Sequence, residues 1–221
     1  SQARMLAADK ASLAALKAID RAQLSASGQL NHDVVAYMLE QRVHGATRYP
    51  YGSTVGYYVP YAISQLSGPY ASVPDFLDSQ HVIETKGDAD AYIQRLRAFA
   101  RVLDTRFQQE DVRYGAFAPD FCLDLALGQM KALRDQPAAS TVLVESIARR
   151  TKEKAIPGDW QAMAEKIVTA EIFPALDRQI ALVAGLRKAA VHDAGCWRLP
   201  NGDQFYADAL MNATTTTPSP D

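Results

Sequence analysis

Cysteine is scarce in this 221-residue chain, which contains only Cys122 and Cys196. Two cysteines are too few to build a disulfide framework. Cys122 falls within a helical pattern and Cys196 near a turn, so we interpret both as small apolar side chains that fill gaps in the packing. One bridge between them is the alternative if the protein is exported, because disulfides persist in oxidising compartments.

The chain also lacks an excess of charge of either sign and any long apolar run. Its 23 basic and 25 acidic side chains give a formal net charge of -2. That balance argues against the basic surface of a nucleic-acid-binding protein. Charged or polar residues interrupt every apolar stretch before it reaches the roughly 20 residues that a membrane helix needs. The hydrophobic content of 48% is enough to fill the core of a soluble globular protein.

Familiar catalytic and metal-binding motifs are missing as well. The four histidines include no pair at a helical i, i+4 spacing, and neither His-Glu-x-x-His nor Cys-x-x-Cys occurs. Glycine-rich phosphate loops are absent from the sequence too. The segment 52–56 approaches a nucleophile elbow but carries Thr54 at its centre instead of serine, so we interpret it as a turn. The sequence predicts no catalytic residue and no metal ligand.

Helical periodicity is the dominant pattern that the sequence does contain. Residues 3–24 fit one helix, which the run 25–28 ends. Asn31 or Asp33 then caps a second helix, since a short side-chain oxygen can satisfy the free N–H groups of a first turn. The apolar stripe of this second helix should face a core; it consists of Val34, Val35, Met38, Leu39 and Val43.

The later part of the chain predicts further helices. The strongest stripe follows Gly87, with Asp88 as the cap, and is made by Tyr92, Leu96, Phe99, Leu103 and Phe107. Further helices are expected after Pro119, over 141–150, over 160–183 with a kink or break at Pro174, and over 200–211. A short strand could form at 196–199. We therefore expect an all-α fold: an irregular helical bundle with little or no strand.

Residues 48–74 form the exception to the helical pattern. Six of the ten tyrosines and four prolines fall in this segment, and proline at such density prevents a long regular helix. We expect a long aromatic loop, and such loops are commonly functional or packed across another element. Two interpretations stay open. The loop packs onto helices with its tyrosine hydroxyls bonded to backbone groups, or it forms a wall that lines a ligand site.

The two ends suggest a piece of a larger protein. Residues 1–4 lack the charged start and apolar core of a signal peptide, and no initiating methionine is present, so we expect that upstream sequence has been removed. Residues 213–221 are rich in threonine, serine and proline, which predicts a flexible end. The alternative is that Thr or Ser, Pro and an acidic residue begin another helix.

Several segments resemble, in order, the bacterial domain of unknown function 885 family. The similarity extends from about Ile19 to the end of the chain, and its ordered spacing is more specific than any one motif. The segments are Pro60–Pro69, Val73–Leu77, His81–Ile83, Asp88–Phe99, Gly195–Asp203, Phe205–Tyr206 and Thr214–Thr216.

The resemblance implies a longer, mostly helical protein that is exported to the periplasm or lipid-anchored. Members of the family look like zinc metallopeptidases, with a His-Glu-x-x-His helix downstream of the threonine run. This chain ends at those threonines, so no zinc ligand or catalytic glutamate is carried over and no cofactor is expected here. The resemblance implies zinc for the full-length protein only, and residues 1–221 are expected to form a single helical domain of it.

Two functions follow from these observations. In the first, the chain is the helical scaffold of a zinc-dependent peptidase-like hydrolase, and its partner is the catalytic half of its own polypeptide. The aromatic loop would then help to line a groove for a peptide substrate, with Tyr57, Tyr58, Gln65 and Tyr206 as the lining residues. In the second, the chain is a non-catalytic helical domain that binds a ligand or a protein.

Overall fold

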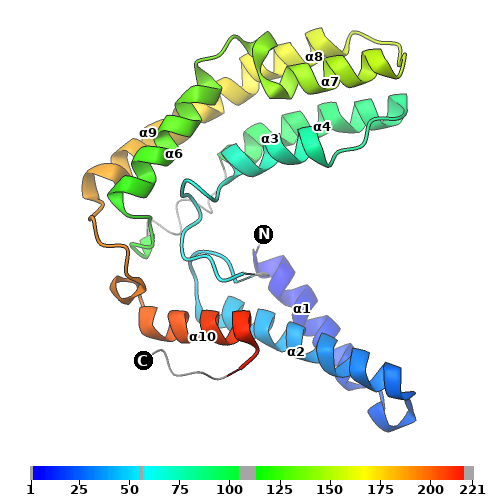
Figure 1. The fold of residues 1–221 in the computed structure, drawn as a ribbon, viewed down its shortest axis with the longest axis vertical. Helices are drawn as coiled ribbons and strands as arrows, with labels where there is room; N and C mark the ends of the chain where they lie inside the picture. The colour runs from blue at the N-terminus through cyan, green and yellow to red at the C-terminus, as the bar shows by residue number, and fades with distance from the viewer. Residues whose placement is uncertain (1, 55–56, 105–112, 217–221) are drawn as a thin grey trace. The chain divides into compact units, whose positions relative to one another are not determined.

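The computed structural model describes residues 2–54, 57–104 and 113–216 of the chain (Figure 1). Helices dominate these residues, and the only β-type pairing among them is an isolated antiparallel bridge between Ser53 and Val59. This confirms the all-α fold. The contacts divide the chain into two compact units, whereas the sequence suggested a single helical domain. Unit 1 comprises Ser1–Tyr61, Arg113–Ala116 and Gly195–Asp221, and unit 2 comprises Ala62–Val112 and Phe117–Ala194.

Unit 1 begins with a helical hairpin. Helix α1 (Gln2–Lys17) packs along α2 (Ala26–Arg48), and a short 3-10 turn, η1 (Arg21–Gln23), joins them. Ser25 caps α2, because its hydroxyl accepts a hydrogen bond of 3.2 Å from the Gly28 N–H. The prediction that Asn31 or Asp33 caps this helix was therefore wrong, and α1 ends seven residues earlier than the sequence suggested.

The apolar stripe of α2 does not face a core in the described structure. Val34 is 50% exposed, Val35 43% and Met38 56%, so the expectation of burial was wrong for these three residues. Helix α2 packs on α1, and the other two members of the stripe, Leu39 and Val43, are half-buried. A helical pattern predicts which residues share a face, but it does not say what covers that face.

The aromatic loop packs onto the C-terminal part of unit 1. Helix α10 (Gly202–Thr214) follows η4 (Cys196–Arg198), a 3-10 turn where the sequence suggested a strand. The turn forms because the Leu199 N–H bonds the carbonyl of Cys196 at 2.9 Å. Tyr49 meets Phe205 edge-to-face, with 5.0 Å between ring centroids. The buried cluster here consists of Tyr49, Tyr51, Ala116, Leu199 and Phe205.

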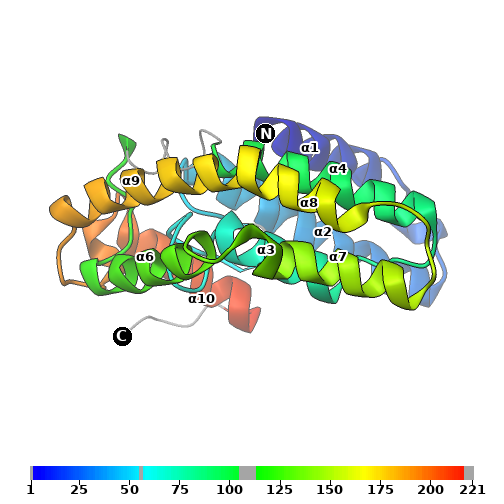
Figure 2. The same cartoon turned by 90° about the horizontal axis from the view of Figure 1, so that it is seen from above.

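Unit 2 consists of six helices, among the described residues, that lie side by side. Figure 2 shows α6 and α7 running in series beside a second row made by α8 and α9, with α3 and α4 alongside. The aromatic loop is shorter than predicted, because Pro69 takes the first position of α3, where its missing N–H costs little. The helices are α3 (Pro69–Ser79), α4 (Lys86–Leu103), α6 (Asp120–Arg134), α7 (Val142–Glu153), α8 (Trp160–Ile167) and α9 (Phe173–Ala189), with the 3-10 turn η2 (Ala138–Ser140) before α7.

Helix α4 buries the apolar stripe that the sequence assigned to it, although α7 and α8 are at least as strongly amphipathic. Its cap is Thr85 rather than Asp88, because Asp88 occupies the third helical position and completes a capping box with Thr85. The predicted residue Phe107 lies outside the described residues. The buried members of the stripe are Tyr92, Leu96, Phe99 and Leu103.

The expected break near Pro174 takes the form of a π-helical turn. Residues Val168–Ile172 (η3) widen the helix between α8 and α9, and Pro174 then occupies the second position of α9. The backbone stays helical from α8 through η3 into α9, and the wide turn just before Pro174 accommodates a residue that has no N–H to donate. The long predicted pattern is thus two helices joined through a wide turn.

Candidate functional site

Unit 1 contains a groove of about 790 Å³ beside α2. Helix α2 forms one wall, the aromatic loop adds Thr54 and Tyr57, and the last turn of α10 closes the other side. Its size falls in the range of ligand sites. The residues that line it are Asp33, Val34, Tyr37, Met38, Gln41, Arg42, Thr54, Tyr57, Asn212, Ala213 and Thr215.

The groove combines exposed apolar side chains with polar atoms that lack a partner. Met38 and Tyr57 are 56% and 81% exposed. Two atoms of lining residues, Gln41 Oε1 and Arg42 Nε, are buried and make no hydrogen bond within the protein. A second guanidinium nitrogen of Arg42 pairs with Asp9 of α1 at 3.0 Å, which anchors the side chain. Buried polar atoms are normally satisfied, so these two atoms are exceptions; because both are buried, a molecule that binds in the groove does not reach them in this arrangement.

A buried carboxylate holds the elements around the groove together. Asp208 of α10 accepts a 2.6 Å hydrogen bond from the Tyr49 hydroxyl and a 2.9 Å bond from His44 Nε2. Gln204 donates a third bond of 3.0 Å to the other carboxylate oxygen. We call these four residues the Asp208 network. It ties the end of α2 and the start of the aromatic loop to α10.

The surroundings of Asp208 keep it ionised. Burial on its own raises the pKa of this carboxyl, but the hydrogen bonds from Tyr49, His44 and Gln204 outweigh that effect and leave its pKa below the ordinary value. Burial raises the pKa of Tyr58 to about 12, with a smaller contribution from the Asp208 charge. A buried tyrosine this weakly acidic stays neutral at physiological pH. These groups serve to hold the groove in shape.

The four predicted lining residues fall in different environments. Tyr57 lines the groove, and Tyr206 is 49% exposed on α10. Tyr58 packs against Phe205 with 5.3 Å between ring centroids, and its buried hydroxyl has no hydrogen-bond partner. Gln65 belongs to unit 2. Their role in lining a substrate groove stays a prediction.

Both interpretations of the aromatic loop find support in unit 1. The Tyr51 hydroxyl donates a 2.7 Å hydrogen bond to the Pro200 carbonyl, as expected for a loop packed onto its neighbours. Tyr57 forms a wall of the groove instead. Sequence reasoning missed Gln41, Arg42 and Asp208, because each looks like an ordinary polar position on a helix and no motif marks it.

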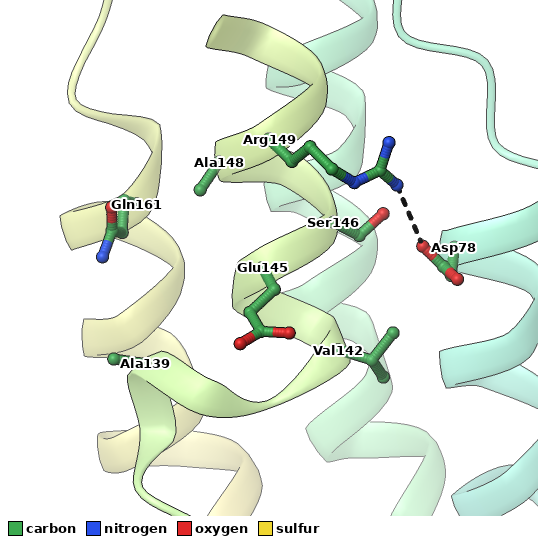
Figure 3. A pocket seen from close by; sticks show the side chains of 8 residues that line it. All are labelled: Asp78, Ala139, Val142, Glu145, Ser146, Ala148, Arg149 and Gln161. Atoms are coloured by element: carbon green, nitrogen blue, oxygen red, sulfur yellow. Dashed lines mark ion pairs between the residues drawn. The ribbon is translucent and has the colours of Figure 1, made fainter. Parts of the chain in front are cut away.

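Unit 2 has a hollow of about 550 Å³ next to α7, drawn in Figure 3. Arg149 reaches from α7 to Asp78 of α3, with 3.8 Å between nitrogen and oxygen, and Gln161 lies on α8. Arg149, Asp78 and the nearby Glu145 are all exposed. Exposed charges of this kind are typical of a solvated helix surface, so we place the candidate site in the groove of unit 1.

A buried histidine in unit 2 is fixed by its neighbours. His81 donates through Nε2 to the Asp88 carbonyl at 3.0 Å and accepts through Nδ1 from Arg95. Arg150 bonds the His81 carbonyl, and Tyr92 lies edge-on to the ring at 5.3 Å. Burial, followed by the positive charges of Arg95 and Arg150, lowers the pKa of His81. This histidine therefore acts as a neutral structural bridge.

The described residues contain no group of three or more His, Cys, Asp or Glu side chains that could hold a metal ion. Three of the histidines instead bond single carboxylates: His32 bonds Asp33, His44 bonds Asp208 and His192 bonds Asp120. Zinc needs at least three protein ligands, so the donor set described here does not fit it. Among the described helices, none combines the length and apolarity that crossing a membrane demands.

Comparison with known proteins shows a family to which the sequence is similar and a solved structure with a similar fold. No curated protein matches the sequence. The fold matches the crystal structure of the putative lipoprotein from Colwellia psychrerythraea with a TM-score of 0.88 at 19% sequence identity. The match covers 99% of this chain but 39% of that one, so the chain spans about two fifths of the length of this solved relative. Residues 1–221 match the family described as bacterial protein of unknown function (DUF885) over their whole length, and the chain belongs to that family.

Proposed function

We propose that this chain is the helical scaffold portion of a zinc-dependent peptidase-like hydrolase whose catalytic motif lies in another part of a longer polypeptide. One observation carries the proposal: nearly the whole chain superposes on only 39% of a solved relative. A helical piece of that kind supplies packing surface for the rest of the protein. Membership of the family supports the resemblance from which the zinc-dependent hydrolase is proposed.

The metal chemistry belongs, in this proposal, to residues other than those described. Their side chains offer no zinc ligand set, so zinc and the catalytic base would come from the other part of the protein. Bound zinc would polarise a peptide carbonyl and activate water there. The contribution of this chain is to support that part, while a substrate-lining role for Tyr57, Tyr58, Gln65 and Tyr206 stays a prediction.

We also propose that the protein is exported and held at a membrane by a lipid anchor. The support is the lipoprotein description of the solved relative. No described helix could serve as a membrane span, and a lipid attached outside the described residues would provide the anchor.

The second candidate is a non-catalytic helical domain that binds a ligand or a protein. The groove beside α2 favours it, because its volume of about 790 Å³ falls in the range of ligand sites and the apolar side chains of Met38 and Tyr57 are exposed along it.

Hydrolysis of quenched fluorescent peptides by the longer polypeptide tests the first candidate. We expect cleavage that a zinc chelator abolishes and added zinc restores. Residues 1–221 alone are the matched control and should cleave nothing. If the longer polypeptide cleaves no peptide, the hydrolase proposal is contradicted and the second candidate is favoured. Cleavage that the chelator leaves unchanged would contradict the dependence on zinc.

A further inference from the structure

His81 joins three helices of unit 2 at one buried point. It follows the end of α3 and is 4% exposed. Its ring Nε2 donates a 3.0 Å hydrogen bond to the Asp88 carbonyl in the first turn of α4, and its Nδ1 accepts from Arg95 of the same helix. Its backbone carbonyl accepts from Arg150 of α7. We call these four residues the His81 junction.

Further contacts hold both arginine side chains of the junction in place. The Arg95 guanidinium lies over the Phe76 ring of α3, at 5.5 Å from the ring centroid. Arg150 also donates to the carbonyls of Leu77 and Asp78, at 3.1 Å and 3.3 Å, and so satisfies free carbonyl groups at the end of α3. Neither guanidinium can turn away from the junction without losing these contacts.

The junction accommodates only a neutral imidazole. A neutral ring has one donor nitrogen and one acceptor nitrogen, and both are used here. Protonation converts Nδ1 into a second donor, which then meets the Arg95 donor with no acceptor between them. It also adds a positive charge at a buried position beside two guanidinium groups.

The nearby carboxylates have other partners. The Asp88 carboxylate accepts from the N–H and the hydroxyl of Thr85 at 2.8 Å each, as part of the capping box. On α3, the Asp78 carboxylate pairs with Arg149, with 3.8 Å between oxygen and nitrogen. A protonated ring therefore has no carboxylate at hand to replace the bond from Arg95.

The remaining titratable group against the ring carries no charge. Tyr92 of α4 lies edge-on to His81, with 5.3 Å between ring centroids, and burial raises the pKa of this tyrosine, so it stays neutral. Burial, followed by the charges of Arg95 and Arg150, lowers the pKa of His81, and the bond to the Asp88 carbonyl offsets this in part. The deprotonated ring is thus the form that fits.

We propose that the His81 junction is a proton-sensitive switch: protonation expels the ring from its site and opens the segment between α3 and α4, while the other helices of unit 2 stay folded. This inference does not depend on the hydrolase proposal. Gln80, Val82 and Glu84 of the segment are exposed, so it can move away at a smaller cost than that of separating packed helices. Mild acidification suffices, because an imidazole in the opened segment regains its ordinary pKa of about 6.5.

Hydrogen–deuterium exchange of the full chain at about pH 7.5 and about pH 5 tests the switch, after correction for the intrinsic pH dependence of exchange. The N–H groups of Gln80 and His81 both bond the Phe76 carbonyl, at 3.0 Å and 2.9 Å, and report on the segment. We expect their protection to fall at least about tenfold at about pH 5, where a pKa of about 6.5 after opening allows up to about thirtyfold. Helix α6, which packs on α9, should keep its protection.

His81→Gln is the matched variant for this experiment. Its side-chain oxygen can accept from Arg95 and its amide can donate to the Asp88 carbonyl, but it does not titrate in this range. Its corrected protection should therefore be the same at both pH values. His192→Gln is the control, because the His192 side chain is 83% exposed, and it should respond as the original protein does.

Three results would overturn the proposal: unchanged protection of Gln80 and His81 at about pH 5, an equal loss of protection in α6, or a loss that persists in His81→Gln. If His81→Gln does not fold, an NMR titration of the His81 ring in the original protein replaces it. The loss of protection should then follow the protonation of this ring, and a midpoint below about pH 4.5, where carboxylates titrate, would overturn the proposal.

Discussion

Replacing Asp208 with alanine tests whether the Asp208 network holds α10 to the rest of unit 1. The substitution removes three hydrogen bonds and leaves the Tyr49 hydroxyl buried without its acceptor. His44 is half-exposed and Gln204 exposed, so water can replace their bonds to the carboxylate. The Tyr49 hydroxyl has no such replacement, and a lost charge-assisted bond at a buried group costs about 3 kcal/mol.

Asp208→Asn should be much milder. The remaining carbonyl oxygen can still accept from Tyr49 and His44, and Gln204 can turn its amide to accept from the new NH₂ group. Only the charge assistance is lost, at about 1 kcal/mol. The matched control is Asp203→Ala on the same helix, where the side chain is exposed and the loss should stay below about 1 kcal/mol.

Urea unfolding of residues 1–221 measures these differences. Trp197 lies in unit 1 and Trp160 is buried in unit 2, so fluorescence in a Trp160→Phe background reports on unit 1 alone. The folded-state pKa of Asp208 is depressed, so its contribution is present above about pH 4 and is lost as the pH falls through that pKa. If Asp208→Ala is no more destabilising than Asp203→Ala at neutral pH, the reasoning is refuted.

Two further predictions concern unit 2. Both polar atoms of the Gln179 amide are buried without a hydrogen-bond partner. Gln179→Met removes these unsatisfied atoms, so it should raise the free energy of unfolding in urea by about 1–3 kcal/mol. A lower free energy of unfolding in the variant would show that the amide is satisfied in solution. The pKa of His81 is lowered on folding, so its contribution is present above about pH 6.5 and is lost as the pH falls through the folded-state pKa. The free energy of unfolding should therefore be lower at about pH 5 than at about pH 7.5. This difference should disappear in His81→Gln and become smaller in Arg95→Gln. If His81→Gln shows the same pH dependence as the original protein, the prediction is contradicted.

The sequence predicted the buried helices of unit 2 well, because neighbouring helices of unit 2 cover their apolar stripes. Leu96 and Phe99 recur at helical spacing and are buried in the structure. Met38 belongs to an equally regular stripe and is exposed, because periodicity carries no information about which element covers a face. Thr85 and Asp88 can each begin a helix, and only the backbone geometry shows that Thr85 caps while Asp88 completes the box.

The candidate site was less predictable than the fold. Tyr57 stood out because aromatic side chains cluster in its loop, and it does line the groove. Gln41, Arg42 and Asp208 carried no signal, since their role depends on contacts between residues that are far apart in the sequence. Asp208 meets His44 across 164 positions, and no local pattern encodes a pairing of that length.

Metal analysis of two purified proteins, the longer polypeptide and residues 1–221, decides whether zinc belongs to this protein. We propose that this chain is the scaffold part of a zinc-dependent protein, and the described residues do not fit zinc. We therefore expect one tightly bound zinc ion for each longer polypeptide and none for residues 1–221. A stoichiometric zinc ion in residues 1–221, or a longer polypeptide that binds none, would contradict it.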